Sequence, residues 1–427
     1  MIRLTGGRVI DPGAGRDETA DLLIDGDRLV DRDGSADETV IDVSGYVVAP
    51  GFVDLHCHLR EPGYEDKETI ASGTAAAAAG GFTTVCALAD TRPSVDTGSD
   101  VESMLTQARR DAVVRVLPFG TVSKRREGQE LSEMADMATA GAIAFSDDGR
   151  AIRSSSLMRH ALEYSLFVDR PVASHAVDPD LADSGVMNEG ALATVLGLKG
   201  TPCEAEEVAV ARDLALARLT GGRLHLAHLS TAGATEQVRR AKAAGVRVTA
   251  EATPHHLLLT EAAVAGQASG RPYDTNARID PPLRTPADAE ALLEGLRDGT
   301  IDCLATDHAP QRWVDKACEF EEAEPGISAF ETAFGLAMRL VHTGRLSLTE
   351  LIALLTVRPC AAWGLAYGTL AAGAPADVVV LDPDQAWVVD VQRFLSRGQN
   401  SPLHGQTLRG TVLLTIASGT VVYRNGV

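Results

Sequence analysis

Apolar and polar positions follow two different patterns along this chain. In the middle, short apolar runs typical of buried strands alternate with Ala-rich or amphipathic stretches typical of helices, such as 204–219 and 234–244. The Ala-rich stretch 74–81 ends in a Gly-Gly pair, which suits the end of a helix. The apolar runs are 52–58, 83–88, 113–119, 142–146, 171–175, 224–228, 247–252 and 302–306.

These eight strand–helix units predict a closed (β/α)8 barrel, the TIM barrel. Alternation of strands and helices builds a parallel sheet, and eight units are the number that closes such a sheet into this barrel. The alternative is an open, doubly wound sheet. A GxGxxG turn after a first strand would favour that alternative, and the sequence contains none.

Both ends of the chain show β-type patterns instead. Runs at 7–10, 21–24 and 39–43 are separated by Asp-Pro-Gly and Asp-Gly turn signals, and similar runs return near the C-terminus at 377–381, 412–416 and 421–423. We therefore predict one small β-sandwich domain built from both termini. Its two parts are expected at 1–50 and 365–427, with the barrel at 51–364.

Composition narrows the classes of function. The 427 residues carry a net charge of -20, which makes nucleic acid and anionic membrane surfaces poor partners and favours a small-molecule substrate. No apolar stretch approaches the ~18 residues of a membrane span. The first residues lack the apolar core of a signal peptide, and the six cysteines are scattered without a CxxC pair. These features predict a cytoplasmic protein with reduced cysteines.

Candidate chemistry lies where the apolar runs end. Strand ends of a (β/α)8 barrel meet at one rim, where active sites are found. Alternate residues of a strand share a face, so His56 and His58 point the same way. A single histidine at a strand end is more often structural, but this chain repeats the pattern at Asp148, His175, His228 and Asp307. Imidazole and carboxylate together suit zinc, or the related Mn, Co and Fe ions, so we predict a hydrolase with one or two divalent ions.

Longer motifs show a resemblance to a known family. The segment 51–63 reads Gly-Phe-Val-Asp-Leu-His-Cys-His-Leu-Arg-Glu-Pro-Gly. Further motifs are Thr-Pro-His-His-Leu at 253–257, Pro-Pro-Leu-Arg at 281–284 and Ala-Thr-Asp-His-Ala-Pro at 305–310. Together they resemble the dihydroorotases of the amidohydrolase superfamily, in the bacterial type with a metal-bridging aspartate. Many amidohydrolases share the His-x-His pair, whereas the combined set is much more specific and covers nearly the whole chain.

The resemblance implies a role for each candidate ligand. One ion would be held by His56, His58 and Asp307, a second by His175 and His228, and both by Asp148. Asp307 would also carry the proton between water and the leaving nitrogen. Hydantoinases in the superfamily bridge the ions with a carboxylated lysine instead. None of the five lysines here ends an apolar run, which favours the aspartate-bridged type.

The resemblance also implies a reaction and partners. The reaction is the reversible, zinc-dependent interconversion of dihydroorotate and N-carbamoyl-L-aspartate in pyrimidine synthesis, with Arg60 gripping the substrate carboxylate. The implied assembly is a homo-oligomer or a complex with aspartate transcarbamoylase.

The chain departs from the family pattern around the expected substrate. Asp90 and Asp280 stand where the family usually has Asn, Gln311 replaces a His, and Pro325 replaces a residue that offers a backbone N–H. We predict that Arg60, Asp90, Asp280 and Gln311 line the substrate site. An ionised Asp90 would repel a substrate carboxylate or compete for Arg60. Dihydroorotate turnover is the favoured function. The alternatives are hydrolysis of another cyclic amide, such as hydantoin, dihydropyrimidine or allantoin, and a weakly active scaffold for aspartate transcarbamoylase.

Overall fold

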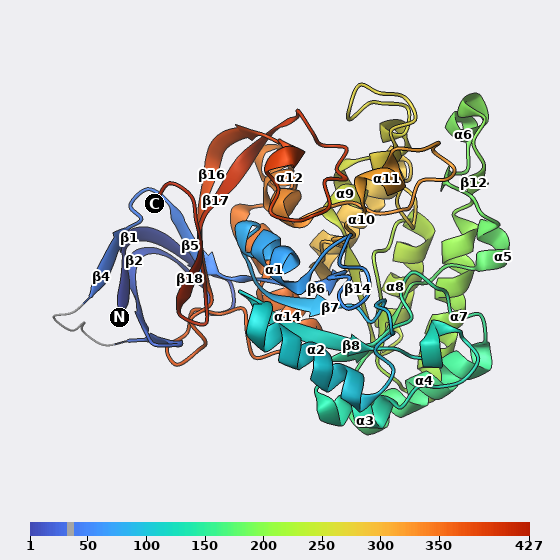
Figure 1. Ribbon diagram of the computed structural model, residues 1–427, viewed down its shortest axis with the longest axis horizontal. Coiled ribbons are helices and arrows are strands. Elements are labelled where there is room, and N and C mark those ends of the chain that lie inside the picture. The colour runs from blue at the N-terminus through green and yellow to red at the C-terminus, as the bar shows by residue number, and fades with distance from the viewer. Residues whose placement is uncertain (32–37) are drawn as a thin grey trace.

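The computed structural model describes residues 1–31 and 38–427, and its larger domain is built around a parallel eight-stranded sheet (Figure 1). Its strands are hydrogen-bonded in chain order, and each falls on one of the predicted apolar runs, which confirms the (β/α)8 barrel. The strands are β6 (Phe52–Cys57), β7 (Phe82–Ala87), β8 (Arg115–Gly120), β9 (Ala144–Phe145), β10 (Val172–Ser174), β13 (Leu224–Leu226), β14 (Val248–Ala252) and β15 (Cys303–Leu304).

One helix follows each barrel strand and covers the outside of the sheet. These helices are α1 (Ile70–Ala79), α2 (Gly98–Asp111), α3 (Met134–Ala140), α4 (Ser155–Val168), α7 (Glu204–Thr220), α8 (Ala232–Ala243), α10 (Pro286–Asp298) and α12 (Phe330–His342), after which α13 (Leu348–Leu355) and α14 (Val357–Trp363) end the barrel. Helix α1 shows how local sequence sets such limits. The Thr69 side chain caps its start, and Gly80 ends it where a Cβ would lie 2.3 Å from the Phe330 carbonyl oxygen.

The barrel closes beyond the end of its last strand. Cys57 of β6 forms a parallel bridge with His308, and the His58 amide donates to the His308 carbonyl at 2.9 Å. This seam therefore joins the first and last strands at the rim where the candidate ligands lie.

Shorter elements fill the loops on that rim. The longest insertion follows β10 and contains a two-stranded sheet that the sequence analysis did not predict. The elements are α5 (Pro179–Ala182), β11 (Met187–Asn188), α6 (Ala191–Leu196), β12 (Gly200–Thr201), α9 (Pro254–Leu258) and α11 (Trp313–Lys316), with 3-10 turns η1 (Lys124–Arg126), η2 (Glu261–Ala263), η3 (Thr275–Ala277) and η4 (Val391–Arg393).

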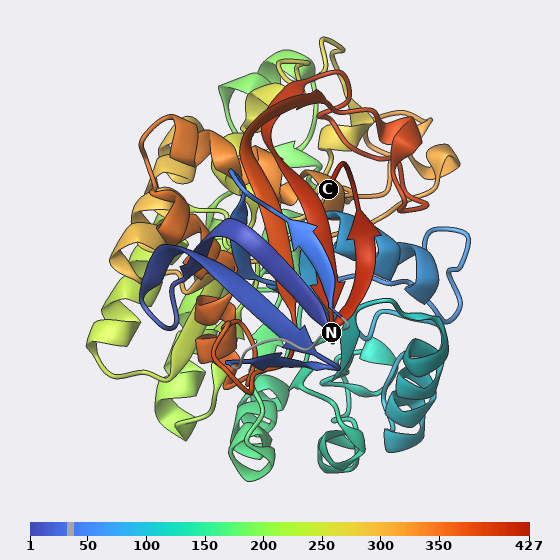
Figure 2. The same ribbon diagram turned by 90° about the vertical axis from the view of Figure 1, so that its left-hand side faces the viewer.

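A second domain is built from both chain ends, as the β-type patterns predict. Figure 2 faces it and shows strands of the N-terminal part, in blue, beside strands of the C-terminal part, in red. The sheet order is β18-β17-β16-β5-β1-β2-β3, and β4 pairs with β1. The strands are β1 (Ile2–Asp11), β2 (Arg16–Asp25), β3 (Arg28–Val30), β4 (Thr39–Asp42), β5 (Val47–Pro50), β16 (Val378–Val388), β17 (Thr407–Ala417) and β18 (Thr420–Arg424).

Both halves of this domain share one apolar core. Leu4 and Ile24 from the N-terminal half pack with Val378 and Ile416 from the C-terminal half, and all four are buried. All the strands belong to one continuous sheet, so the predicted sandwich has a single hydrogen-bonded sheet folded around this core. Within 1–31 and 38–427, no helix has the length and apolar character needed to cross a membrane.

Candidate metal centre

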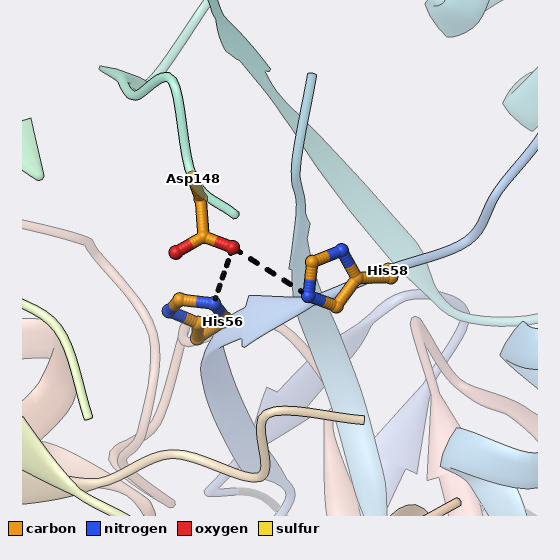
Figure 3. A group of neighbouring side chains, drawn as sticks. All are labelled: His56, His58 and Asp148. Atoms are coloured by element: carbon orange, nitrogen blue, oxygen red, sulfur yellow. Dashed lines mark ion pairs between the residues drawn. The ribbon is translucent and has the colours of Figure 1, made fainter. Parts of the chain in front are cut away.

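Four buried side chains from three strand ends converge at the seam of the barrel. His56 and His58 come from the end of β6, Asp148 follows β9, and Asp307 follows β15. Figure 3 shows Asp148 directing one carboxylate oxygen, Oδ2, toward both imidazole rings. That oxygen lies 3.5 Å from His56 Nε2 and 3.7 Å from His58 Nε2. Asp307 Oδ1 lies at 3.7 and 3.5 Å from the same two nitrogens.

These separations fit a divalent ion. Four ligands at ~2.0–2.1 Å around a tetrahedral ion are ~3.4 Å from one another. The observed spacings of 3.5–3.7 Å are close to that edge length. His56 Nε2 is buried and has no hydrogen-bond partner among the described residues. A buried nitrogen that lacks a partner yet faces two carboxylates is suited to bind a cation.

The second oxygen of Asp148 faces a second group of donors. Asp148 Oδ1 lies 3.2 Å from His228 Nε2 and 3.6 Å from His175 Nδ1, and these two nitrogens are 3.1 Å apart. His175 and His228 follow β10 and β13. The Asp148 carboxylate is therefore shared by two donor groups, with one oxygen facing each group. The first group also contains Asp307, and the second contains His175 and His228. The structure brings all six predicted ligands together in one cluster, with Asp148 between the two groups.

The electrostatics of the centre favour positive charge. Burial alone would lower the pKa of the His56 ring, but Asp148 and Glu251 raise it well above its usual value. Burial would also lower the pKa of His175, but the nearby carboxylates of Asp280 and Asp148 raise it to about 9. In the protein alone, the carboxylates therefore stabilise protons on these rings. The same negative field stabilises a divalent cation in their place.

Two further carboxylates orient the histidines of the first group. Glu251, from the interior of β14, accepts from His56 Nδ1 at 2.8 Å and from His225 Nε2 at 3.0 Å. Asp90 lies 2.9 Å from His58 Nδ1. Each contact holds the ring hydrogen on Nδ1 and leaves Nε2 directed at the candidate ion, as in carboxylate–histidine–metal triads.

Glu251 was missed from the sequence because it stands inside an apolar run and not at its end. Its signal is that a charged residue interrupts the run 247–252, and such a residue is buried at a cost unless it is paired. Asp54 gives the same signal inside the first run. It accepts from the Thr306 amide at 2.8 Å and from the Thr306 hydroxyl at 2.6 Å, directly before Asp307.

Asp307 needs this support because its backbone lies in the left-handed region, at φ 45°. Thr306, held by Asp54, precedes it. His308 follows it, with Nε2 3.3 Å from the buried Glu68 and Nδ1 accepting from the Ala329 amide at 3.1 Å. Asp307 is thus fixed from both sides.

The pair that follows β14 lies around the centre and not within its donor groups. His256 is bound to the Thr253 side chain at 2.8 Å and to the Pro281 carbonyl at 2.9 Å. Burial lowers the pKa of His255 to about 4, so this ring is neutral at pH 7. Its Nε2 lies 4.0 Å from Asp307 Oδ2.

A cavity of about 650 Å³ opens beside the second donor group, lined in part by His175 and Asp280. The Asp280 side chain is 48% exposed, and its Oδ2 is 3.5 Å from His175 Nε2. Arginines also line the cavity, namely Arg126, Arg150, Arg153 and Arg278. Their charges offset the acidic surface of the chain and suit an anionic ligand.

The other predicted substrate residues are engaged within the protein. Arg60 forms a 2.5 Å ion pair with Asp90, so the competition expected from the sequence is present in the structure. Gln311 accepts from Lys67 Nζ at 2.7 Å and donates to the Pro325 carbonyl at 2.6 Å. Of the four predicted substrate residues, Asp280 therefore lines the cavity, while Arg60, Asp90 and Gln311 are tied to protein partners.

A (β/α)8 barrel with two His–Asp donor groups around one shared carboxylate defines a metal-dependent hydrolase of the amidohydrolase class. Comparison with known proteins agrees with this class. A model of the amidohydrolase family matches residues 204–423, and a dihydro-orotase-like family model matches residues 45–234.

The chain belongs to the dihydroorotase family. It is 47% identical to a dihydroorotase of Syntrophus aciditrophicus (strain SB), covering 99% of both chains. It is 48% identical to that of Anaeromyxobacter sp. (strain K), covering 100% of this chain and 98% of the relative.

Solved structures share the fold at lower identity. The L-hydantoinase (dihydropyrimidinase) of Arthrobacter aurescens superposes with a TM-score of 0.87 at 24% identity, covering 100% of this chain and 96% of the other. The dihydropyrimidinase of Brevibacillus agri NCHU1002 gives a TM-score of 0.85 at 23% identity, covering 99% and 95%.

Proposed function

We propose that this chain interconverts dihydroorotate and N-carbamoyl-L-aspartate by reversible hydrolysis of the cyclic amide C–N bond, a step of pyrimidine synthesis. Relatives named dihydroorotase, 47–48% identical over nearly the full length of both chains, support this reaction. The structural observation that carries the proposal is the placement of Asp148, with one oxygen facing each donor group.

In this proposal His56, His58 and Asp307 would hold one ion, His175 and His228 would hold the other, and Asp148 would offer one oxygen to each. We propose zinc, because its tetrahedral preference matches the donor spacings and types. When bound, such ions lower the pKa of water to near neutral and polarise the substrate carbonyl.

The proton is assigned to Asp307. Burial would raise its pKa, but the surrounding histidines, His58 first, hold the pKa of this carboxyl below its usual value, so it is ionised near pH 7. It accepts a proton from the attacking water and returns it to the nitrogen of the opening ring. Neutral His255, beside Asp307 Oδ2, leaves this carboxylate without a fixed cationic partner on that side.

Substrate recognition is proposed for the side of the cavity. Asp280 lines it and offers carboxylate oxygens that could accept from an amide N–H of a cyclic substrate, and the arginines there suit the substrate carboxylate. Arg60 reaches the same carboxylate only after leaving Asp90. We assign Gln311 to shaping this wall, because both ends of its amide are bound to the protein.

The ion pair between Arg60 and Asp90 favours one alternative function. If it persists, the site loses a carboxylate-binding cation, and a less anionic cyclic amide such as hydantoin or dihydropyrimidine becomes the better substrate. The deciding experiment is a substrate panel of dihydroorotate, hydantoin, dihydropyrimidine and allantoin, with metal content measured on the same sample. Turnover of dihydroorotate supports the proposal, whereas hydrolysis of another member without it refutes the proposal.

Asp307→Asn tests the proton role. It keeps an oxygen ligand of similar geometry but removes the base, so we expect turnover to be abolished while most metal stays bound. Full activity in this variant would remove Asp307 from the mechanism.

We also propose that the chain works in the cytoplasm, as a homo-oligomer or in a complex with aspartate transcarbamoylase. Both assemblies can be tested by asking whether an untagged copy of this chain, or aspartate transcarbamoylase, co-purifies with the tagged chain.

A further inference from the structure

The connection between β16 and β17, residues 389–406, leaves the β-domain and packs on the catalytic rim of the barrel. Strands β16 and β17 lie on the side of the β-domain that faces the barrel (Figure 1). Glu331 at the start of α12 accepts from the Leu395 amide at 2.9 Å. Val389 and Leu403 pack in a buried apolar cluster with Ile327. A segment that follows the barrel in sequence therefore becomes part of its rim.

Asn400 is the residue of this segment that contacts the chain after Asp307. Its Oδ1 accepts from the Gln311 amide at 2.9 Å, and its Nδ2 donates to the Ala309 carbonyl at 3.1 Å. Asn400 is 3% exposed. Both ends of the Asn400 side-chain amide are therefore bonded to this loop, and water does not compete for these hydrogen bonds.

The same side chain ties this loop to a second one. Asn400 Nδ2 donates to the Gly326 carbonyl at 2.9 Å, and its Oδ1 accepts from the Ser328 hydroxyl at 2.8 Å. The two loops approach so closely that a Cβ on Gly326 would lie 2.5 Å from the Ala309 carbonyl oxygen. Only glycine fits there, because a side chain would collide with the Ala309 carbonyl and because the φ of 134° is one that other residues rarely adopt.

We infer that Asn400 is a positioning residue that sets the place of the Asp307 carboxylate. Asp54 and Thr306 hold the chain before the strained backbone of Asp307, and His308 holds it directly after. The loop that continues from His308 must itself be held in place for this anchoring to be rigid. Asn400 holds that loop by acting as a clamp that joins residues 309 and 311 to residues 326 and 328. This inference rests on the proposed role of Asp307, but the clamp itself can be measured without turnover.

Asn400→Asp is the variant that tests the inference. It keeps the size of the side chain but replaces the two N–H donors with an oxygen that repels the carbonyls of Ala309 and Gly326. We expect kcat for dihydroorotate to fall about 10- to 100-fold, since ~1 Å misplacement of a reacting group has effects of this size. KM should change less than about threefold, because none of the residues that the Asn400 side chain contacts lines the cavity. The matched control is Asn425→Asp, at an exposed position in the same part of the chain.

A second readout uses Co²⁺ binding to the metal-free protein. A displaced Asp307 no longer completes the first donor group, so Asn400→Asp should bind Co²⁺ about tenfold more weakly at one site. Asp307→Asn, which keeps its oxygen in place, should bind more tightly than Asn400→Asp. This titration decides the inference even if dihydroorotate is not the substrate.

Ser328→Ala covers the case in which Asn400→Asp does not fold. It removes one bond of the clamp, and we expect kcat to fall about threefold, with a matching loss of Co²⁺ affinity. The inference is overturned if a folded Asn400→Asp protein keeps kcat and Co²⁺ affinity within twofold of the unaltered chain. It is overturned equally if, with Asn400→Asp unfolded, Ser328→Ala leaves both quantities unchanged.

Discussion

Glu251→Gln is expected to weaken divalent-ion binding, because glutamine cannot accept the two hydrogen bonds that the carboxylate accepts. Trp363 Nε1 is a donor only, and it lies 3.2 Å from His225 Nδ1. His225 Nδ1 is therefore an acceptor, and its Nε2 carries the hydrogen that is donated to Glu251 Oε2. The other oxygen accepts from His56 Nδ1, which leaves His56 Nε2 with a free lone pair for an ion.

The size of the effect follows from this chain of contacts. Glutamine offers one acceptor oxygen and one donor NH₂ group, so one of the two rings must face a donor. If that ring is His56, its hydrogen moves to Nε2 and blocks the ion. The variant also removes one negative charge beside the centre. Losing such a supporting carboxylate typically weakens metal affinity 10- to 100-fold, or ~1.4–2.7 kcal/mol. We expect the upper end of this range for Glu251.

The measurement is a calorimetric titration of metal-free protein with Co²⁺ or Zn²⁺. Glu102→Gln, at an exposed position on α2, is the control for the loss of one carboxylate. Thermal unfolding of both metal-free variants separates an effect on binding from an effect on folding. Affinity within twofold of the unaltered chain in a folded Glu251→Gln protein would refute the tautomer argument.

Three further outcomes are expected. Asp90→Asn should release Arg60 while an amide oxygen still accepts from His58, so KM for dihydroorotate should fall about tenfold, and an unchanged KM in steady-state assays would contradict this. Burial lowers the pKa of Lys316 to about 7, so the unfolded chain binds more protons between pH 7 and 10.5 and stability rises with pH in that window. Denaturant unfolding should show a gain of ~3 kcal/mol from pH 7 to 9.5 that Lys316→Met lacks, and equal pH slopes would count against it. Adding Zn²⁺ at a hundred times its Kd should stabilise the metal-free protein by ~2.7 kcal/mol, and chelation should reverse the shift in Tm.

The barrel and its donor groups could be predicted from the sequence because both depend on short local patterns of apolar and polar residues. Each strand is a short apolar run, and each candidate ligand ends such a run, so the periodicity places His175 or His228 at the rim without knowledge of any contact. The two-part β-domain was predictable in outline, since both chain ends show alternating runs and turn signals.

The residues that support the site could not be predicted in the same way. Asn400 lies 93 positions after Asp307 in the sequence, in a connection with no periodic pattern, and its role follows only from tertiary packing. Asp90 was interpreted from the sequence as a group acting on the substrate, whereas the structure also places it against His58. The paired β11 and β12 strands are two residues each, too short for any pattern to indicate.

The seam between Cys57 and His308 has a consequence for the motions of the barrel. The two strands that meet there carry donors of the same group, His56 and His58 on one side and Asp307 on the other. A bound ion would therefore link the chain after β6 to the chain after β15, the two end strands of the sheet, which are not paired with each other along their length. Opening of this seam should be rarer in the loaded protein, and the His58 amide, bonded across it to the His308 carbonyl, should exchange its hydrogen with solvent more slowly than in the metal-free protein.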